Sequence, residues 1–297
     1  MQVAPQPFGE LLNSWFRTIG RTWKPLLATS LVVQIPLGIA VLIVFWATGS
    51  AGELATLIGS DLDSVPPEEI AAMLRPVWWT VGIWMALQLP ATAFIFLAAA
   101  RIVADDWSGS TPTTSRASRH AARKTPSGVL WIVVVLLAAA VLVGVAVAAG
   151  WVVIGLAGTN FLTVFATTVI ALTVLVTMAW LGVSISFGLP IISVEGPGAI
   201  RALPRSHFLV TGRWWVTLGF ILLIGVISSV ASQVLSLVLV PVYVAGFFVP
   251  EAFAVAMVTA VVLQAPFTAA SAAGYTIWYL DLRSRVEMLQ TEQLAGD

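Results

Sequence analysis

The chain has 297 residues, of which 59% are hydrophobic and only 9% are charged, and its formal net charge is zero. An ordinary soluble domain has about 25% charged residues, so this composition excludes a water-soluble fold and indicates a bilayer as the solvent. The balanced charge excludes the strongly basic class of nucleic-acid-binding proteins, and the absence of cysteine excludes disulfides and thiolate chemistry. We therefore expect one all-α integral membrane domain over residues 1–297, with no cofactor.

The first expected element is an amphipathic helix within residues 1–24. Its apolar side chains recur at helical spacing, and they are Phe8, Leu11, Leu12, Trp15, Ile19 and Trp23. Arg17 and Arg21 are four residues apart on another face. Such a helix lies in the membrane interface, with its rings at headgroup depth and its guanidinium groups toward anionic phosphates.

Six apolar stretches follow, and charged residues mark their ends. Each is long enough to cross a hydrocarbon core of about 30 Å. The expected spans are 25–47, 77–100, 129–155, 161–192, 214–240 and 253–279. The third and fourth form a hairpin, because 157–160 (Ala-Gly-Thr-Asn) is the only turn-like break between Lys124 and Glu195. The sequence thus predicts a polytopic membrane helix bundle of about six transmembrane helices with interfacial amphipathic helices.

Basic residues predict the orientation, since cytoplasmic loops are rich in Lys and Arg. Of the 14 Lys and Arg residues, all except Arg75 lie on one side of the expected bundle. We expect a multi-pass protein of the cell inner (plasma) membrane with both termini in the cytoplasm. The cytoplasmic segments would be the loops 101–127 and 193–213 and the tail 281–297. Residues 48–75 would form an extracytoplasmic loop, in which Pro66-Pro67-Glu68-Glu69 favours the start of a short helix.

Two pairs of segments indicate internal repetition. Residues 13–23 match 205–215 at Ser, Phe, Gly, Arg and Trp, and 87–93 match 263–269 at Leu, Gln, Pro, Thr and Ala. Asp105 and Asp281 follow the second pair at the same offset. One interpretation is three copies of an amphipathic helix with a transmembrane hairpin, and chance matching in an Ala/Val-rich chain is the alternative. Internal symmetry is common in transporters, but duplicated hairpins also build scaffolds.

A Gln-x-Pro pattern recurs in three spans, as Gln34/Pro36, Gln88/Pro90 and Gln264/Pro266. Proline frees the carbonyl four residues back, and a glutamine amide can satisfy such a group or bond across helices. The structural interpretation is three kinks. The functional one is a polar mid-membrane cavity lined by Gln34, Gln88, Gln233 and Gln264, as in a transporter or lipid translocase. The middles of the spans contain no ionisable residue, which disfavours proton-coupled transport.

Arginines beside tryptophans form the other candidate site. Residues 197–215 resemble the first amphipathic helix, and a third basic patch contains Arg116, Arg119, His120, Arg123 and Lys124. These patches are orientation anchors, or they bind an anionic lipid headgroup or a partner protein. The candidate binding residues are Arg17, Arg21, Trp23, Arg205, Arg213, Trp214, Trp215, Arg283 and Arg285.

Catalytic patterns are absent from the sequence. It has two histidines, no metal-ligand spacing and no Gly-rich phosphate loop. The acids Asp105, Asp106, Glu195 and Asp281 lie at span ends, where arginines can pair with them, as Arg285 can with Asp281 at i, i+4. An interfacial lipid-metabolism enzyme would need these acids within about 5 Å of one another. We expect a non-enzymatic module whose partners are membrane lipids or another membrane protein, and not nucleic acid.

Three short motifs give the chain a family resemblance. They are residues 8–12 (FGELL), the RSxxLVxGRWW stretch at 205–215, and residues 279–285 (YLDLRSR). In these motifs and in layout, the chain resembles the bacterial membrane-domain family named after the membrane region of glycerophosphoryl diester phosphodiesterase. Some members of that family carry a fused phosphodiesterase domain and others stand alone. The resemblance implies a stand-alone membrane module, since this chain has no barrel domain and no histidine–carboxylate set for phosphodiester hydrolysis.

Overall fold

The structure is a computed structural model that describes residues 6–50, 56, 66–246 and 250–287, and the described part is α-helical without strands. The first four long helices are α1 (Phe8–Ala47), α3 (Pro67–Trp107), α4 (Thr114–Ala157) and α5 (Phe161–Ile185). The remaining elements are α6 (Gly188–Val194), α7 (Ala199–Val210), α8 (Trp214–Ser236), η2 (Leu237–Leu239), α9 (Val240–Gly246) and α10 (Pro250–Glu287). The expected all-α bundle is confirmed.

Five stretches of the described chain are long and apolar enough to cross a membrane, as the composition predicts. They are Phe8–Ala47, Glu68–Trp107, Thr114–Ala157, Phe161–Val194 and Trp214–Leu239. The sixth expected span, 253–279, lies in α10, which is not among the five. Helix α10 packs against α1, α3 and α8.

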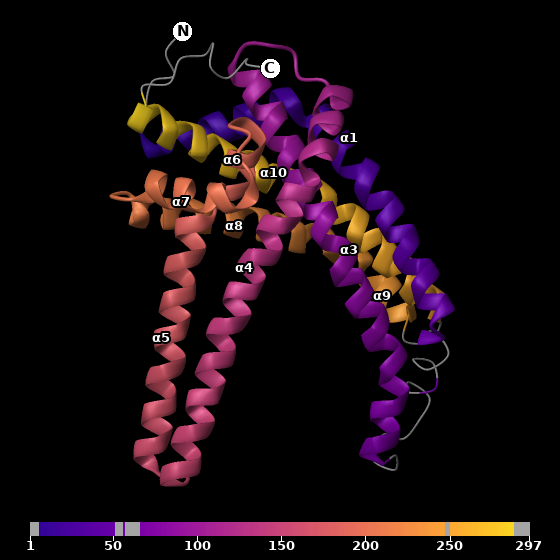
Figure 1. The fold of residues 1–297 in the computed structure, drawn as a ribbon. Helices are drawn as coiled ribbons and strands as arrows, with labels where there is room; N and C mark the ends of the chain where they lie inside the picture. The colour runs from indigo at the N-terminus through magenta and orange to yellow at the C-terminus, as the bar shows by residue number, and fades with distance from the viewer. Residues whose placement is uncertain (1–5, 51–55, 57–65, 247–249, 288–297) are drawn as a thin grey trace.

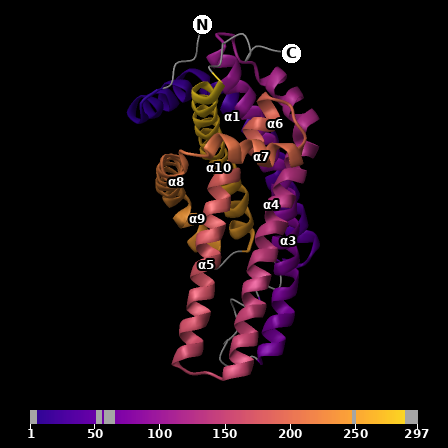
Figure 2. The same ribbon diagram turned by 60° about the vertical axis from the view of Figure 1, so that its left-hand side comes forward.

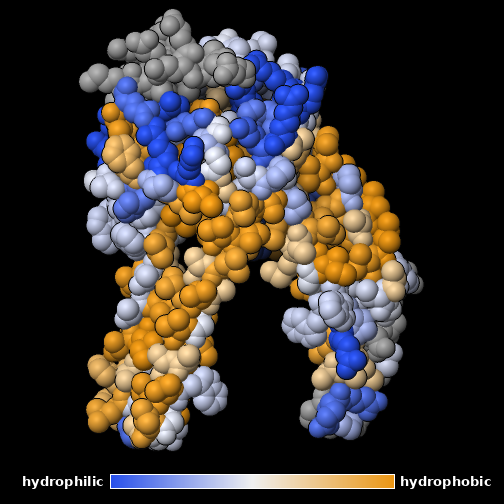
Figure 3. Space-filling view, in the orientation of Figure 1, coloured by the Kyte–Doolittle hydropathy of each residue, from blue (hydrophilic) through white to orange (hydrophobic). Residues whose placement is uncertain are grey.

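The long helices meet at one end of the molecule and diverge from it (Figures 1 and 2). We call this the basic end: α1, α4 and α8 begin there, and α3 and α10 end there, joined by contacts such as Arg21 with Asp106 and Arg205 with Glu287. Helices α4 and α5 run away from it side by side, and α1 and α3 run away on the other side. Figure 3 shows hydrophilic residues gathered at the basic end and hydrophobic residues below it.

Helices α4 and α5 expose large apolar side chains along their length. Leu156 is 85% exposed and Phe161 is 81% exposed, on either side of the turn between the helices. Gly158 makes this turn with φ +67°, and Asn160 caps α5 in a reciprocal capping box with Thr163. The expected turn at 157–160 is therefore where the hairpin bends. Apolar exposure on this scale requires hydrocarbon around the hairpin.

Several expected segment boundaries differ from the structure, because charge ends a membrane span without ending a helix. Residues 101–127 were expected as a loop, but α3 continues to Trp107 and α4 starts at Thr114. The amphipathic stretch within 1–24 belongs to α1, and residues 281–287 of the expected tail belong to α10. The helix at Pro67 is the start of α3 and not a short one. The rest of the expected 48–75 loop lies largely outside the described residues.

The expected span 161–192 is interrupted at Ser186–Phe187, between α5 and α6. Ser206 of α7 closes this break: its hydroxyl accepts from the backbone N–H of Phe187 at 3.2 Å and donates to the carbonyl of Ser184 at 2.9 Å. A side chain thus satisfies backbone groups that the interrupted helix leaves free. The loop 193–213 accordingly contains a packed helix, α7.

The main hydrophobic core lies at the basic end, and a smaller cluster of Leu37, Val41 and Ala91 lies between the diverging helices α1 and α3. Its largest fully buried side chains are Trp15, Trp278, Tyr279, Phe187 and Phe220. The indole N–H of Trp15 donates to the carbonyl of Ala270 at 2.9 Å, which joins α1 to α10. Trp278 stacks on Phe220 with ring centroids 4.8 Å apart, which joins α10 to α8. The basic end is therefore a packed platform that fixes the positions of polar groups.

Candidate functional site

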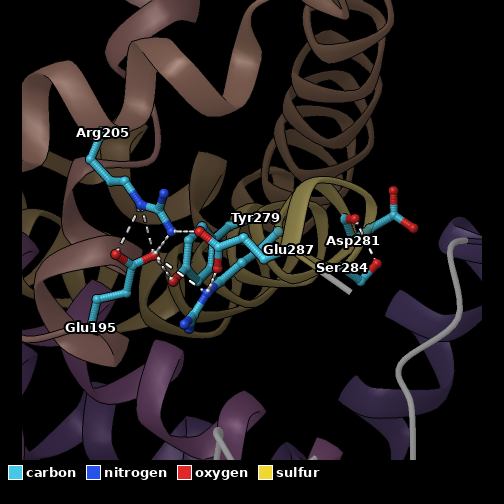
Figure 4. A network of polar contacts seen from close by, with 7 residues as sticks. Glu195, Arg205, Tyr279, Asp281, Ser284 and Glu287 are labelled. Atoms are coloured by element: carbon cyan, nitrogen blue, oxygen red, sulfur yellow. Dashed lines mark hydrogen bonds and ion pairs between the residues drawn. The ribbon is translucent and has the colours of Figure 1, made fainter. Parts of the chain in front are cut away.

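A network of ion pairs connects α6, α7 and α10 at the basic end (Figure 4). Arg205 Nε lies 3.0 Å from Glu195 Oε2, and the hydroxyl of Tyr279 donates to Glu195 Oε1 at 2.8 Å. Glu287 accepts from Arg205 and, at 2.8 Å, from Arg283. Two guanidinium groups thus face two carboxylates. Arg205 and Arg283, two of the residues predicted to bind lipid or a partner, thus pair with carboxylates of the same chain.

Two more candidate arginines are paired within the protein. Arg285 binds Asp281 at 2.6 Å, the i, i+4 pair expected from the sequence, and Asp281 also accepts from the backbone N–H of Gln6 at 2.9 Å. Arg21 binds Asp106 at 2.7 Å but stays half exposed. These contacts join the start of α1 to the ends of α10 and α3.

The other candidate residues of this set lie at the surface of the basic end. Arg17 and Arg213 are exposed, and no ion-pair partner for either lies in the described part of the chain. Trp23 and Trp215 are 52% and 78% exposed, in matching places in the two similar segments. Trp214 is half-buried, and its indole N–H donates to the carbonyl of Trp180 at 3.2 Å. This surface combines aromatic rings and cations, as interfacial segments do.

The four span-end acids pair with four different sets of arginines. Asp105 pairs with Arg101 and Arg116, Asp106 with Arg21, Glu195 with Arg205 and Arg283, and Asp281 with Arg285. Among the described residues, no group of three or more His, Cys, Asp or Glu residues could hold a metal ion. In the described chain, these four acids therefore form salt bridges with arginines.

The Glu287 carboxylate gives the ion-pair network a pH dependence. Partial burial opposes ionisation of Glu287, but hydrogen bonds from Arg283 and Arg205 outweigh it and lower the pKa of the carboxyl below its ordinary value of 4.5. A lowered folded-state pKa gives stabilisation that is complete above the unfolded pKa and lost as pH falls through the folded one.

We expect Glu287→Gln to unfold at a lower temperature than the wild type at about pH 7, and this gap to close below about pH 4. Thermal unfolding in detergent at several pH values measures the gap. The control is Glu69→Gln, at the opposite end of α3 from the ion-pair network, whose unfolding temperature should match that of the wild type at each pH. A gap independent of pH would contradict the ionic role of Glu287.

A second cluster of arginines forms a pocket between the end of α3 and the start of α4. Its volume is about 320 Å³, and its lining residues are Arg101, Arg116, Arg119, His120 and Arg123. The α4 residues share one helical face because they follow Arg116 at i+3, i+4 and i+7. We call this the arginine pocket.

Positive charge is in excess in the arginine pocket. Asp105 is the one carboxylate that pairs with its lining residues in the described part of the chain: Arg101 lies 2.9 Å and Arg116 4.0 Å from Asp105 Oδ1. Neither Arg119 nor Arg123 has an ion-pair partner among the described residues, and both are exposed. Four guanidinium groups therefore face the pocket with one compensating carboxylate.

Hydrogen bonds to α6 fix the wall of the arginine pocket. His120 Nε2 lies 3.0 Å from the carbonyl of Ser193, and the hydroxyl of Ser193 donates to the carbonyl of Leu97 at 2.8 Å. Lys124 donates to the carbonyl of Gly196 at 3.2 Å. These bonds join α3, α4 and α6, so the pocket lies on rigid elements, as a binding site requires.

Three of the four candidate glutamines line one cavity of about 330 Å³ in the middle of α1, α3 and α10. They are Gln34, Gln88 and Gln264, each from a different helix. Gln233 lies on α8, is exposed and is not a lining residue. The prolines of the three Gln-x-Pro motifs lie inside helices that continue through them. We call this the glutamine cavity.

The basic patch at 116–124 indicates part of the arginine pocket from the sequence alone, but no sequence pattern indicates that Arg101 belongs to it. Arg101 ends an expected span, as any anchoring arginine does, and only the packing of α3 on α4 turns it toward the patch.

Comparisons with protein-family models, curated proteins and solved structures gave no match. The resemblance to the phosphodiesterase-associated membrane family therefore stays a prediction, and the proposals below depend on the geometry.

Proposed function

We propose that the chain is a non-enzymatic integral membrane module that binds the phosphate of an anionic lipid in the arginine pocket. The observation that carries this proposal is the excess of four guanidinium groups over one carboxylate in a pocket of about 320 Å³. Guanidinium groups donate paired, charge-assisted hydrogen bonds that match the geometry of phosphate oxygens.

The surroundings of the pocket favour a lipid as the source of the phosphate. The pocket lies just before the uncharged stretch of α4 that follows Lys124, and cations beside the end of an apolar span lie near the headgroup layer of a bilayer. Phe16, Trp23, Phe208 and Trp215 expose more than half of their surface at the same end of the molecule. Such rings prefer the headgroup region. Nearly all Lys and Arg residues lie at the basic end, which supports placing this end, and with it the pocket, at the cytoplasmic leaflet of the plasma membrane.

The arginines of the basic end have different roles in this proposal. Arg205, Arg283 and Arg285 hold helices together through Glu195, Glu287 and Asp281. Arg17 and Arg213 attract anionic membranes generally, with about 1 kcal/mol for each cation near the surface. The arginine pocket supplies the selective contacts.

The test is a charge-matched pair of triple variants. Arg116→Gln/Arg119→Gln/Arg123→Gln removes three pocket cations and leaves the buried Arg101 in place. We expect at least about tenfold weaker binding of dioctanoyl phosphatidylglycerol, because each charge-assisted bond contributes about 1.5–3 kcal/mol. Native mass spectrometry of the purified protein, titrated with this lipid, measures the affinity.

The matched control is Arg17→Gln/Arg201→Gln/Arg213→Gln, which removes the same charge from exposed positions outside the pocket. It should retain most of the affinity. Equal losses of affinity in the two variants would mean that the lipid responds only to the total positive charge and not to the pocket, and would overturn the proposal. If inorganic phosphate binds as tightly as the lipid, the part of the proposal that identifies the ligand as a lipid is wrong.

A further inference from the structure

The glutamine cavity has two buried polar atoms without a hydrogen-bond partner in the described part of the chain. They are Oε1 of Gln34, which accepts, and Nε1 of Trp84, which donates. Gln34 is only 3% exposed. A buried polar group without a partner costs about 1–3 kcal/mol, so the cavity favours an occupant that supplies both a donor and an acceptor.

The two similar segments of the sequence meet in this cavity. Gln88 and Thr92 of α3 correspond to Gln264 and Thr268 of α10, and all four line it. In each segment the amide and the hydroxyl are four residues apart, so they share one helical face. Gln34, from the first Gln-x-Pro motif, adds the third amide. The motif thus brings hydrogen-bonding groups from three helices to one place.

The rest of the lining is apolar and uncharged. Gly38, Val41, Val258 and Val261 contribute to it, and no residue that the structure describes there is ionisable. Gly38 also brings α1 close to α10, because a Cβ there would lie 3.1 Å from Cγ1 of Val258. An ion at this depth would need compensating charge, which the lining residues do not supply. The chemistry therefore selects a neutral ligand with one polar and one apolar part.

We propose that the glutamine cavity binds a neutral membrane amphiphile through its hydroxyl group. A hydroxyl both donates and accepts, so it can satisfy Gln34 and Trp84 together. An alkyl chain suits the valines on the cavity wall. The volume of about 330 Å³ is within the range of small-molecule sites.

This inference does not depend on the arginine pocket. The glutamine cavity belongs to α1, α3 and α10 and the pocket to the α3–α4 junction, and they share no lining residue. One site can therefore fail its test while the other passes.

Photolabelling with a diazirine derivative of octanol tests the proposal on the full-length protein. Irradiation followed by peptide mapping should place adducts on the cavity-lining peptides of α1, α3 or α10. Excess octanol should protect them, whereas octane and octanoate should not, because the first lacks the hydroxyl and the second is charged.

The decisive variant is Gln34→Leu, matched by Gln233→Leu outside the cavity. We expect Gln34→Leu to reduce saturable labelling at least about fivefold, the effect of one lost buried hydrogen bond, and Gln233→Leu to leave it unchanged. Gly38→Val is a second variant, which narrows the cavity without removing an amide and should also reduce labelling. Unchanged labelling in both cavity variants, equal protection by octane, or labelling that does not saturate would each overturn the proposal.

Discussion

Asp105→Asn is expected to destabilise the protein by about 3–5 kcal/mol, the effect of leaving one partner of a buried ion pair without compensation. Asp105 is 1% exposed and Arg101 is 5% exposed. Their atoms lie 2.9 Å apart, but neither carboxylate oxygen of Asp105 has a hydrogen-bond partner in the described chain. The pair is therefore held by charge, which asparagine lacks. Equilibrium unfolding in mixed micelles, followed by tryptophan fluorescence, measures the loss.

The neighbouring residue provides the control for this prediction. Asp106 pairs with Arg21, which is half exposed, so Asp106→Asn should cost less than about 1 kcal/mol. A double variant, Arg101→Met/Asp105→Leu, removes both charges and should recover much of the loss, since apolar replacements of buried pairs are often neutral. Similar losses for Asp105→Asn and Asp106→Asn would contradict the buried-charge explanation.

Gly188→Ala is expected to destabilise the protein by about 3 kcal/mol, at the upper end of the overpacking range. A Cβ at this position would lie 2.1 Å from Nε1 of Trp131, a core residue of α4. The indole would have to leave its place, and the contact between α4 and α6 would loosen. Unfolding measured as for Asp105→Asn tests this loss.

Gly182→Ala is the matched control, because a Cβ at Gly182 meets nothing within 4 Å. It should be neutral or stabilising by up to about 1 kcal/mol, since alanine is the better helix former. If both alanines behave alike, the close packing of α6 on Trp131 is not a constraint on the fold.

The sequence predicts the helical membrane class well, because hydropathy acts locally. The turn at 157–160 could be predicted from residue types. Glycine readily adopts the positive φ found at Gly158, and asparagine is a preferred N-cap residue, the role of Asn160 in α5. The i, i+4 pair of Asp281 and Arg285 was also readable, because one helix sets its spacing.

The long-range pairs could not be read in the same way. Arg205 and Glu287 are 82 residues apart, and nothing in either segment specifies the other. Arg205, which looks available for lipid when α7 is considered alone, therefore pairs with carboxylates of other elements. The break at Phe187 was equally hidden, because the hydroxyl that closes it comes from Ser206 in a later helix.

The glutamine cavity could be predicted only in part from the sequence. The recurring Gln-x-Pro pattern indicates that three helices carry an amide beside a proline, but not that the amides face one another. Mutual packing of α1, α3 and α10 brings Gln34, Gln88 and Gln264 together, and it leaves Gln233 on another helix.

The bond between Trp15 and Ala270 spans 255 residues, and the bond between Gln6 and Asp281 spans 275. These bonds of the basic end can therefore form only after α10 has left the ribosome and entered the bilayer. Before that, α1 can already pack on α3, to which the ion pair of Arg21 and Asp106 joins it, since membrane helices insert first and associate afterwards. Closure of α1 onto α10 is thus a late step in the assembly of these helices, and a truncation within α10 would remove the packing of α10 on α1, α3 and α8 while leaving the contacts among the earlier helices.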